Sequence, residues 1–100
     1  MEASIAQRLD EIQFLFRKYG AESAFLFGSA ASGTMTEDSD VDFLFSFPSD
    51  MDYVVYSDNY FALAHALEVL LGRRVDLVAE KTLQNPYLVN SIERNKVQLV

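Results

Sequence analysis

The apolar and polar positions of this chain follow helical and strand-like spacing in turn. The first segment carries apolar residues at the three- and four-residue intervals of an amphipathic helix, at Ile5, Leu9, Ile12 and Phe16. Ser4 followed by Gln7 resembles a capping box, and Gly20 stands where a helix C-terminal cap is expected. This pattern predicts a first helix that begins near Ser4 and ends at Gly20.

The rest of the chain alternates between predicted strands and predicted helices. Apolar, β-branched and aromatic residues predict four strands, the last of them short: Ser23–Phe27, Asp40–Phe47, Arg74–Val78 and Val97–Val100. The segments between them predict a loop or helix start at Gly28–Gly33, a helix capped by Ser57 or Asp58 and ended by Gly72, and a helix from Asn85-Pro86 with Leu88 and Ile92 inward. Strands that alternate with helices indicate an α/β fold, with one sheet of three to four strands and helices packed on it.

Composition places the chain among small globular domains. One hundred residues, 50% of them apolar, suffice for one domain spanning residues 1–100 and are too few for two. The chain has no cysteine, which excludes disulfides and thiol chemistry. No apolar run approaches the about 18–20 residues of a membrane span, and the N-terminus lacks the pattern of a signal segment. We therefore expect a cytoplasmic protein that does not enter a membrane.

Negative charge is concentrated in the middle of the chain. The formal net charge is −7, from 15 Asp and Glu against 8 Lys and Arg. Residues 28–58 contain no Lys or Arg, and their acidic residues are Glu37, Asp38, Asp40, Asp42, Asp50, Asp52 and Asp58. A protein that binds DNA or RNA needs a basic surface, so we expect no direct nucleic-acid binding. A ligand that bears phosphate would approach this region only together with cations.

Two carboxylates at strand spacing indicate a metal site within this acidic region. Residues two apart in a strand point to the same face, so Asp40 and Asp42 would lie side by side while Val41 and Phe43 enter the core. Like charges held together in a half-buried strand are costly, and a divalent cation such as Mg²⁺, which prefers hard oxygen ligands, would remove that cost. The alternative is an edge strand that turns both aspartates into water.

Two further features could contribute to one site together with these aspartates. Asp76 is flanked by apolar residues in its strand, where an unpaired carboxylate is costly, so it either completes a carboxylate triad or pairs with Arg73 or Arg74. Gly28-Ser29 directly follows a strand, where backbone N–H groups and the Ser29 hydroxyl could hold a phosphate. The alternative for Gly28-Ser29 is a tight turn without a ligand.

Together these residues resemble a known signature. Gly28-Ser29, a gap of ten residues and then Asp40-Val41-Asp42 resemble the GSX10DXD motif of the polymerase β-type nucleotidyltransferase superfamily. More narrowly, nearly the whole chain is similar to the minimal nucleotidyltransferases (MNT proteins), which pair with HEPN-domain proteins in prokaryotic toxin–antitoxin systems. The further matching features are Gly33, Ser39 before the first aspartate, the RRVDLV segment with Asp76, and the C-terminal LQNPYLVNSIERNKVQLV.

The resemblance implies a polymerase β-like nucleotidyltransferase fold with a mixed sheet. It also implies nucleotidyl transfer from a nucleoside triphosphate, with ATP as the expected donor, assisted by two Mg²⁺ ions. It assigns Asp40, Asp42 and Asp76 as catalytic metal ligands, and Gly28, Ser29 and Ser39 as nucleotide-binding residues. Asp40 and Asp42 would bridge both ions, and Asp76 would hold the ion nearer the attacking hydroxyl.

The resemblance further implies a protein partner, a HEPN-type toxin whose tyrosine accepts AMP, so that the chain serves as the antitoxin. Two alternatives stay open: an antitoxin of weak or no activity that acts only by binding its toxin, and a transferase for a small-molecule hydroxyl. The first alternative has a basis in the sequence. Many relatives carry an arginine directly before the glycine aligned with Gly33, whereas this chain has Ser32 there, and its nearest cations are Arg73 and Arg74 beside Asp76.

The stretch Met51–Phe61 (MDYVVYSDNYF) combines aromatic and acidic residues. One interpretation is a surface that faces such a partner or a purine. The other is a loop that is anchored by its aromatic side chains and leads into a helix.

Overall fold

The computed structural model describes all residues from Met1 to Val100. Its centre is a four-stranded sheet in the order β3-β2-β1-β4, with β1 at Ser23–Phe27, β2 at Val41–Ser46, β3 at Val75–Ala79 and β4 at Val97–Gln98. The helices are α1 (Ala3–Ala6), α2 (Leu9–Lys18), α3 (Gly28–Ser32), α4 (Tyr53–Leu71), the 3₁₀ helix η1 (Glu80–Thr82) and α5 (Pro86–Asn95). None of these helices has both the length and the apolar character that a membrane span requires. The α/β fold with one mixed sheet is confirmed.

The strand order sets which side chains share a face. β1 pairs antiparallel with β2 and with β4, whereas β2 and β3 are parallel. Parallel neighbours need a long crossover, which α4 supplies between β2 and β3. In this register Val41 lies opposite Val75, and Asp42 lies opposite Asp76. The sheet therefore has one apolar face and one face that carries carboxylates.

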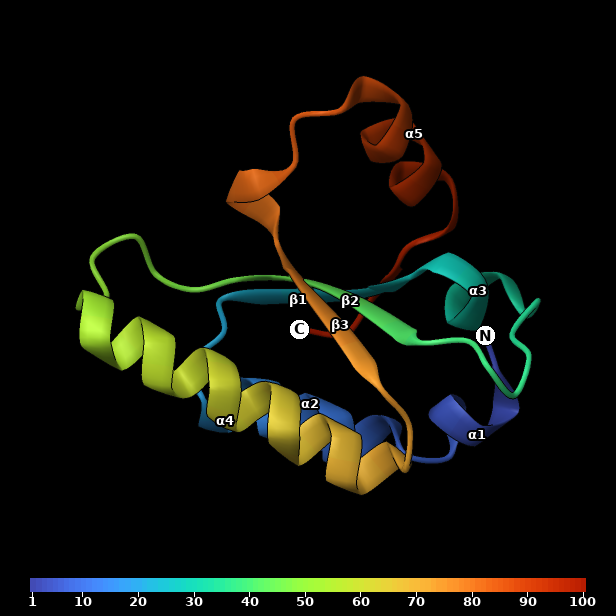
Figure 1. Ribbon diagram of the computed structural model, residues 1–100, viewed down its shortest axis with the longest axis horizontal. Helices are drawn as coiled ribbons and strands as arrows, with labels where there is room; N and C mark the ends of the chain where they lie inside the picture. The colour runs from blue at the N-terminus through green and yellow to red at the C-terminus, as the bar shows by residue number, and fades with distance from the viewer.

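The apolar face of the sheet packs against α2 and α4. In Figure 1 these two helices lie together on one side of the sheet, while η1 and α5 lie on the other side. Phe43 and Phe45 of β2, Phe16 of α2, and Leu63 and Leu67 of α4 are completely buried. The Phe16 and Phe43 rings meet edge to face, with centroids 5.3 Å apart. Burial of each such side chain stabilises the folded protein by about 1.5–3 kcal/mol. This packing holds β2 in place, and with it the carboxylate that β2 carries.

β3 is an edge strand, and side chains of α4 satisfy its outer backbone groups. The Val75 N–H donates to Glu68 Oε2 at 3.1 Å, and the Tyr60 hydroxyl donates to the Leu77 carbonyl at 3.0 Å. Burial, and after it the charge of Asp76, raises the pKa of the Tyr60 phenol above its ordinary value. These bonds occupy groups that an edge strand would otherwise offer to another strand, and they hold β3 against β2.

The first helical segment differs from the prediction because it is divided. α1 ends at Ala6 and α2 begins at Leu9, and the intervening Arg8 has φ −107° and ψ 13°, outside the helical region. Ser4 lies inside α1, which has no side-chain cap, so the predicted capping box is wrong. The break still allows Ile5 and the apolar side of α2 to be buried in the same core, and Gly20 ends the segment with φ 87°, as predicted.

The long helix α4 begins earlier than predicted. Its N-cap is Asp52, whose carboxylate accepts from the N–H groups of Val54 and Val55, and not Ser57 or Asp58. Most of the aromatic stretch Met51–Phe61 therefore forms the first turns of a helix, and the interpretation as a loop is wrong. Gly72, with φ 65°, ends the helix as predicted.

The C-terminal helix α5 begins where the sequence predicts. The Asn85 side chain accepts from the Tyr87 N–H at 2.9 Å, with Pro86 in the first turn. Of the two side chains expected inward, Ile92 is 3% exposed but Leu88 is 44% exposed. The helix therefore contacts the rest of the fold along a narrower stripe than expected.

Candidate active site

The strand order brings three of the predicted site residues together on the face of the sheet that points away from α2 and α4 (the open face). Because β1 and β2 are antiparallel, Phe27 pairs with Asp42, which places the next residue, Gly28, beside the start of β2. From the other side of β2, Asp76 pairs in register with Asp42. Gly28, Asp42 and Asp76 come from three different strands or strand ends and meet at one point.

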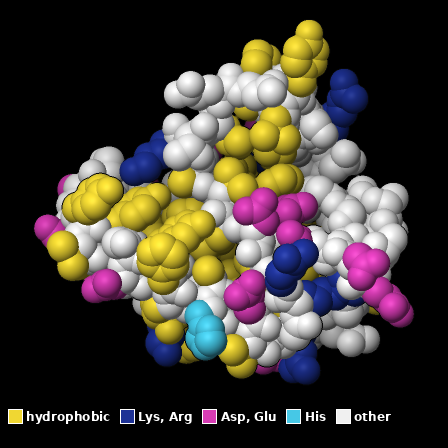
Figure 2. Space-filling view, in the orientation of Figure 1, with side chains coloured by type: hydrophobic (Ala, Val, Ile, Leu, Met, Phe, Trp, Pro, Cys, Tyr) yellow, Lys and Arg dark blue, Asp and Glu magenta, His cyan; other side chains and the backbone are white.

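Charged side chains at the starts of β2 and β3 form two successive cross-strand pairs. Asp42 and Asp76 are one pair. The pair two residues earlier is Asp40 and Arg74, whose Oδ1 and Nε atoms lie 3.3 Å apart. Figure 2 shows acidic side chains near the middle of the view, with a basic side chain beside them. Two alternatives from the sequence are wrong: β2 is an interior strand and not an edge strand, and Arg74 pairs with Asp40 and not with Asp76.

The surroundings of Asp42 disfavour a negative charge on its carboxyl group. Burial, then the charge of Asp76 and then that of Asp40 raise the pKa of the Asp42 carboxyl to about 6. Asp42 is half-buried, whereas Asp76 is exposed. Because neighbouring carboxylates disfavour the ionised form of Asp42, a cation placed among them would stabilise it.

This arrangement predicts that Asp42→Asn stabilises the metal-free protein at neutral and higher pH. The folded-state pKa of Asp42 lies above its ordinary value, so this carboxyl contributes stability below about pH 4 and loses that contribution as the pH rises through about 6. Solvent screening of the half-buried group reduces the effect, and we expect the variant to gain about 1 kcal/mol at pH 8 relative to pH 4.5. Urea unfolding with a chelator at both pH values measures this gain.

Asp58→Asn, on the exposed side of α4, is the control for loss of one negative charge. An Asp42→Asn gain that is the same at pH 4.5 and pH 8 would contradict the electrostatic account of the site.

The backbone conformation at residue 28 and the nearness of the Asp42 carboxylate both require glycine at this position. Its φ of +70° lies in the left-handed region, which favours glycine, and it opens the one-turn helix α3. A Cβ atom at this position would overlap the Oδ2 atom of Asp42. From the sequence, Gly28 was expected either to let a phosphate approach the backbone or to form a tight turn without a ligand. The structure shows that a carboxylate already approaches its backbone.

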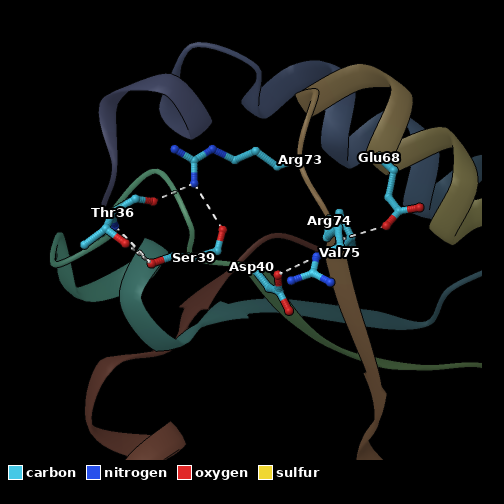
Figure 3. A network of polar contacts seen from close by, with 7 residues as sticks. All are labelled: Thr36, Ser39, Asp40, Glu68, Arg73, Arg74 and Val75. Carbon is cyan, nitrogen blue, oxygen red and sulfur yellow. Dashed lines mark hydrogen bonds and ion pairs between the residues drawn. The ribbon is translucent and has the colours of Figure 1, made fainter.

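Of the other predicted nucleotide contacts, one lies beside this point and one is held in a loop. Ser29 follows Gly28 on α3 and is half-buried. The Ser39 hydroxyl accepts from the Thr36 N–H at 3.0 Å, within the loop between α3 and β2. Arg73 fixes the same loop, because its Nη1 donates to the carbonyls of Thr36 and Ser39 at 2.9 and 3.1 Å (Figure 3). The role of Ser39 as a nucleotide contact stays a prediction.

The two different roles of the adjacent arginines Arg73 and Arg74 were not predicted from the sequence. Arg73 holds a loop, and Arg74 contacts a site carboxylate. The sequence feature that could have identified Arg74 as a site residue is its position two residues before Asp76, because residues two apart in a strand lie on the same face.

The donor set fits a divalent cation, with one of the three expected ligands turned away. Asp42 and Asp76 offer the hard oxygen ligands that Mg²⁺ prefers, and their mutual repulsion is the cost that such an ion relieves. No three acidic or histidine side chains lie close enough to enclose a metal ion, and Asp40 is turned to Arg74. Exposed ion pairs of this kind are worth about 0–1 kcal/mol, so Asp40 can change partner at small cost.

The protein also has a pocket that none of the three carboxylates lines. It has a volume of about 690 Å³ and opens where β2 and β3 end, beside the first turns of α4, with walls that include Phe45, Phe47, Tyr53, Tyr56 and Tyr60. The apolar area beside the acidic group in Figure 2 covers this part of α4. The stretch Met51–Phe61 thus supplies much of the wall, and its interpretation as a surface for a partner or a purine stays a prediction.

Comparisons with known sequences identify the family of the chain. Residues 6–99 match the family model of the nucleotidyltransferase domain. A Methanocaldococcus jannaschii protein, provisionally named protein adenylyltransferase MJ1379, is 41% identical over 80 residues, which cover 80% of this chain and 78% of that protein. The protein adenylyltransferase MntA of Thermococcus cleftensis is 38% identical over 74 residues, which cover 71% and 68% of the two chains.

Solved structures share the fold over nearly the whole chain. A structure provisionally described as a minimal nucleotidyltransferase matches with a TM-score of 0.77 and 34% identity, and covers 97% of this chain and 95% of that one. A toxin–antitoxin crystal structure with AMP-PNP matches with a TM-score of 0.71 and 26% identity over 92% of this chain and 72% of that one. The polymerase β-like arrangement expected from the sequence is therefore that of the minimal nucleotidyltransferases.

Proposed function

This chain belongs to the nucleotidyltransferase domain family, and from that premise we propose that it transfers AMP from ATP to a hydroxyl group, a tyrosine of a HEPN-type toxin, as the antitoxin of that pair. The observation that carries the proposal is the placement of Asp42 and Asp76 in register, on the open face of the sheet beside Gly28. A carboxylate pair beside a glycine turn fits metal-assisted phosphoryl chemistry better than any other chemistry that this chain's side chains offer.

The proposed roles follow from the positions of the side chains. Asp42 and Asp76 would hold divalent cations, and Asp40 would join them when its carboxylate leaves Arg74. When bound, two Mg²⁺ ions supply Lewis-acid stabilisation of the α-phosphate and of the departing pyrophosphate. Ser29 and the backbone at Gly28 would contact the terminal phosphates. The acceptor oxygen forms a bond to the α-phosphorus, the bond to the pyrophosphate oxygen breaks, and Asp76 lies where it could help the acceptor lose its proton.

The proposed partner rests on the relatives and on the charge of the chain. Two relatives are named protein adenylyltransferases, and a solved toxin–antitoxin structure shares the fold. The relatives are named for adenylyl transfer to a protein, so we take the acceptor tyrosine from the partner. The acidic middle of the chain would attract a partner with a basic surface.

The test is transfer of label from ATP to the partner. The chain is incubated with Mg²⁺, ATP labelled in the α-phosphate and a HEPN-type protein encoded by the neighbouring gene, and the acceptor is then analysed by mass spectrometry. We expect AMP on a tyrosine, and no transfer from ATP labelled in the γ-phosphate. Asp42→Asn should abolish transfer, whereas Asp58→Asn should retain it.

The alternatives give different results in the same experiment. Neutralisation of the toxin without any transfer would favour an antitoxin that acts only by binding. Pyrophosphate release with a small-molecule alcohol, and none with the protein, would favour a transferase for small-molecule hydroxyls.

A further inference from the structure

Arg74 is the basic residue that the sheet places directly against the site carboxylates. Val41 and Val75 are register partners, so the residues that precede them, Asp40 and Arg74, stand side by side at the entrance to β2 and β3. Arg74 precedes Asp76 by two positions, which puts both on the same face of the strand. Figure 3 shows the guanidinium group directed at Asp40.

The bonding of Arg74 leaves most of its donors available. It contacts Asp40 through Nε alone, at 3.3 Å, and the side chain is 82% exposed. A guanidinium group has five N–H donors in a planar fork, so the two terminal nitrogens remain for an acceptor from solution. The neighbouring Arg73 is different, because it is committed to two loop carbonyls.

A triphosphate site also needs a cation, and neither β1, the glycine turn nor β2 supplies one. No Lys or Arg occurs between Lys18 and Arg73, and the glycine turn that faces the carboxylates is followed only by small residues. A triphosphate carries several negative charges, and a planar guanidinium binds phosphate oxygens in a bidentate manner. Because the exposed contact with Asp40 is weak, a polyphosphate would displace that single carboxylate.

We propose that Arg74 exchanges partners: it pairs with Asp40 in the free protein and with the terminal phosphates of a nucleoside triphosphate in the loaded protein. The exchange releases the Asp40 carboxylate at the moment when the site receives its substrate. Arg74 thus acts as a phosphate-binding residue, at a position of the fold different from the residue before Gly33. This inference rests on the proposed function, because it assigns a binding residue to the same substrate.

The exchange predicts opposite effects on two ligands. Arg74→Ala removes a contact to the phosphates, so binding of inorganic tripolyphosphate with Mg²⁺ should weaken about tenfold or more. The same change removes a positive charge beside Asp40, so binding of Mg²⁺ alone should be unchanged or tighter. AMP lacks the terminal phosphates, and its affinity in the presence of Mg²⁺ should change by less than about twofold. Isothermal titration of the full chain measures all three affinities.

Two variants control this experiment. Arg17→Ala removes the same charge from the exposed side of α2, in the layer behind the sheet, and should leave all three affinities as they are. Arg74→Lys keeps the charge without the planar fork and should fall between wild type and Arg74→Ala.

Equal tripolyphosphate affinity in Arg74→Ala and wild type would overturn the inference. A parallel loss of Mg²⁺ and tripolyphosphate binding would overturn it as well, because Arg74 would then only position the carboxylates. If the wild-type chain binds neither tripolyphosphate nor ATP in the presence of Mg²⁺, the proposed function fails together with this inference. Binding of both ligands by the wild type keeps the two questions separate.

Discussion

Asp76→Asn is expected to lower the rate of AMP transfer at least about 100-fold while leaving the chain folded. Asp76 is exposed and lies in register with Asp42, so its carboxylate lies on the open face of the sheet and does not contribute to the core. Loss of one ligand for the cations removes several kcal/mol of transition-state stabilisation, and each 1.36 kcal/mol is about tenfold in rate. Rates of AMP transfer at saturating ATP measure the effect.

The stability of the same variant separates a role in the site from a role in the fold. Removal of a negative charge beside Asp42 relieves repulsion, so the metal-free Asp76→Asn protein should be at least as stable as wild type. Glu80→Gln is the matched control, because Glu80 is also exposed and directly follows β3, yet lies at the opposite end of that strand. Transfer by Asp76→Asn at half the wild-type rate or more would show that Asp76 is only a solvated surface residue.

The two carboxylates should also behave as a unit. If Asp42 and Asp76 hold the same ions, the double variant should lose little more activity than either single variant, since the ions are already lost after one change. Losses that multiply would indicate two independent contributions and would contradict a shared metal site.

The alternation of side chains in β2 could be predicted from the sequence, whereas its partners could not. Val41 and Phe43 are apolar and Asp42 between them is not, so a strand must place Asp42 on the face away from the core. Which strand lies beside it depends on the crossover through α4, a contact between residues more than thirty positions apart. The pairing of Asp42 with Asp76 was therefore one of two open alternatives, and only the register decides it.

The ends of helices were harder to predict, because several residues offered similar local chemistry. Asp52, Ser57 and Asp58 are all good N-cap residues, and the choice among them depends on where the chain leaves β2. Asp52 is selected because its carboxylate reaches the N–H groups of the first turn, and the long helix then begins directly after the turn that follows Pro48. The spacing of apolar residues cannot locate this start, since Tyr53 and Val54 are exposed.

The nearness of Gly28 to Asp42 has a similar explanation. A glycine after a strand predicts a tight turn or a phosphate site, and both descriptions concern only its own backbone. The contact with the Asp42 carboxylate arises from the antiparallel pairing of β1 and β2, which the local sequence does not contain.

Gly28→Ala is expected to reduce AMP transfer about 100-fold, through displacement of Asp42 and not through unfolding. A Cβ atom at residue 28 would overlap Asp42 Oδ2, and the end of an aspartate side chain can turn away more easily than the backbone can move. A displacement of about 1 Å at a catalytic group is enough to cost about 100-fold in rate. The left-handed φ of +70° adds a backbone cost of about 1–2 kcal/mol to the free energy of folding.

Gly72→Ala isolates the contribution of the backbone, and the comparison decides the role of Gly28. Gly72 has a φ of +65°, and a Cβ atom there would meet nothing within 4 Å, so its alanine variant should lose similar stability but keep full transfer activity. Urea unfolding of both variants should therefore give similar losses. Added Mg²⁺ should raise the unfolding midpoint of Gly72→Ala as it does for wild type, and should raise that of Gly28→Ala much less. Equal activity in the two variants would mean that Asp42 does not need its present position, and the metal site would then have to lie elsewhere on the sheet.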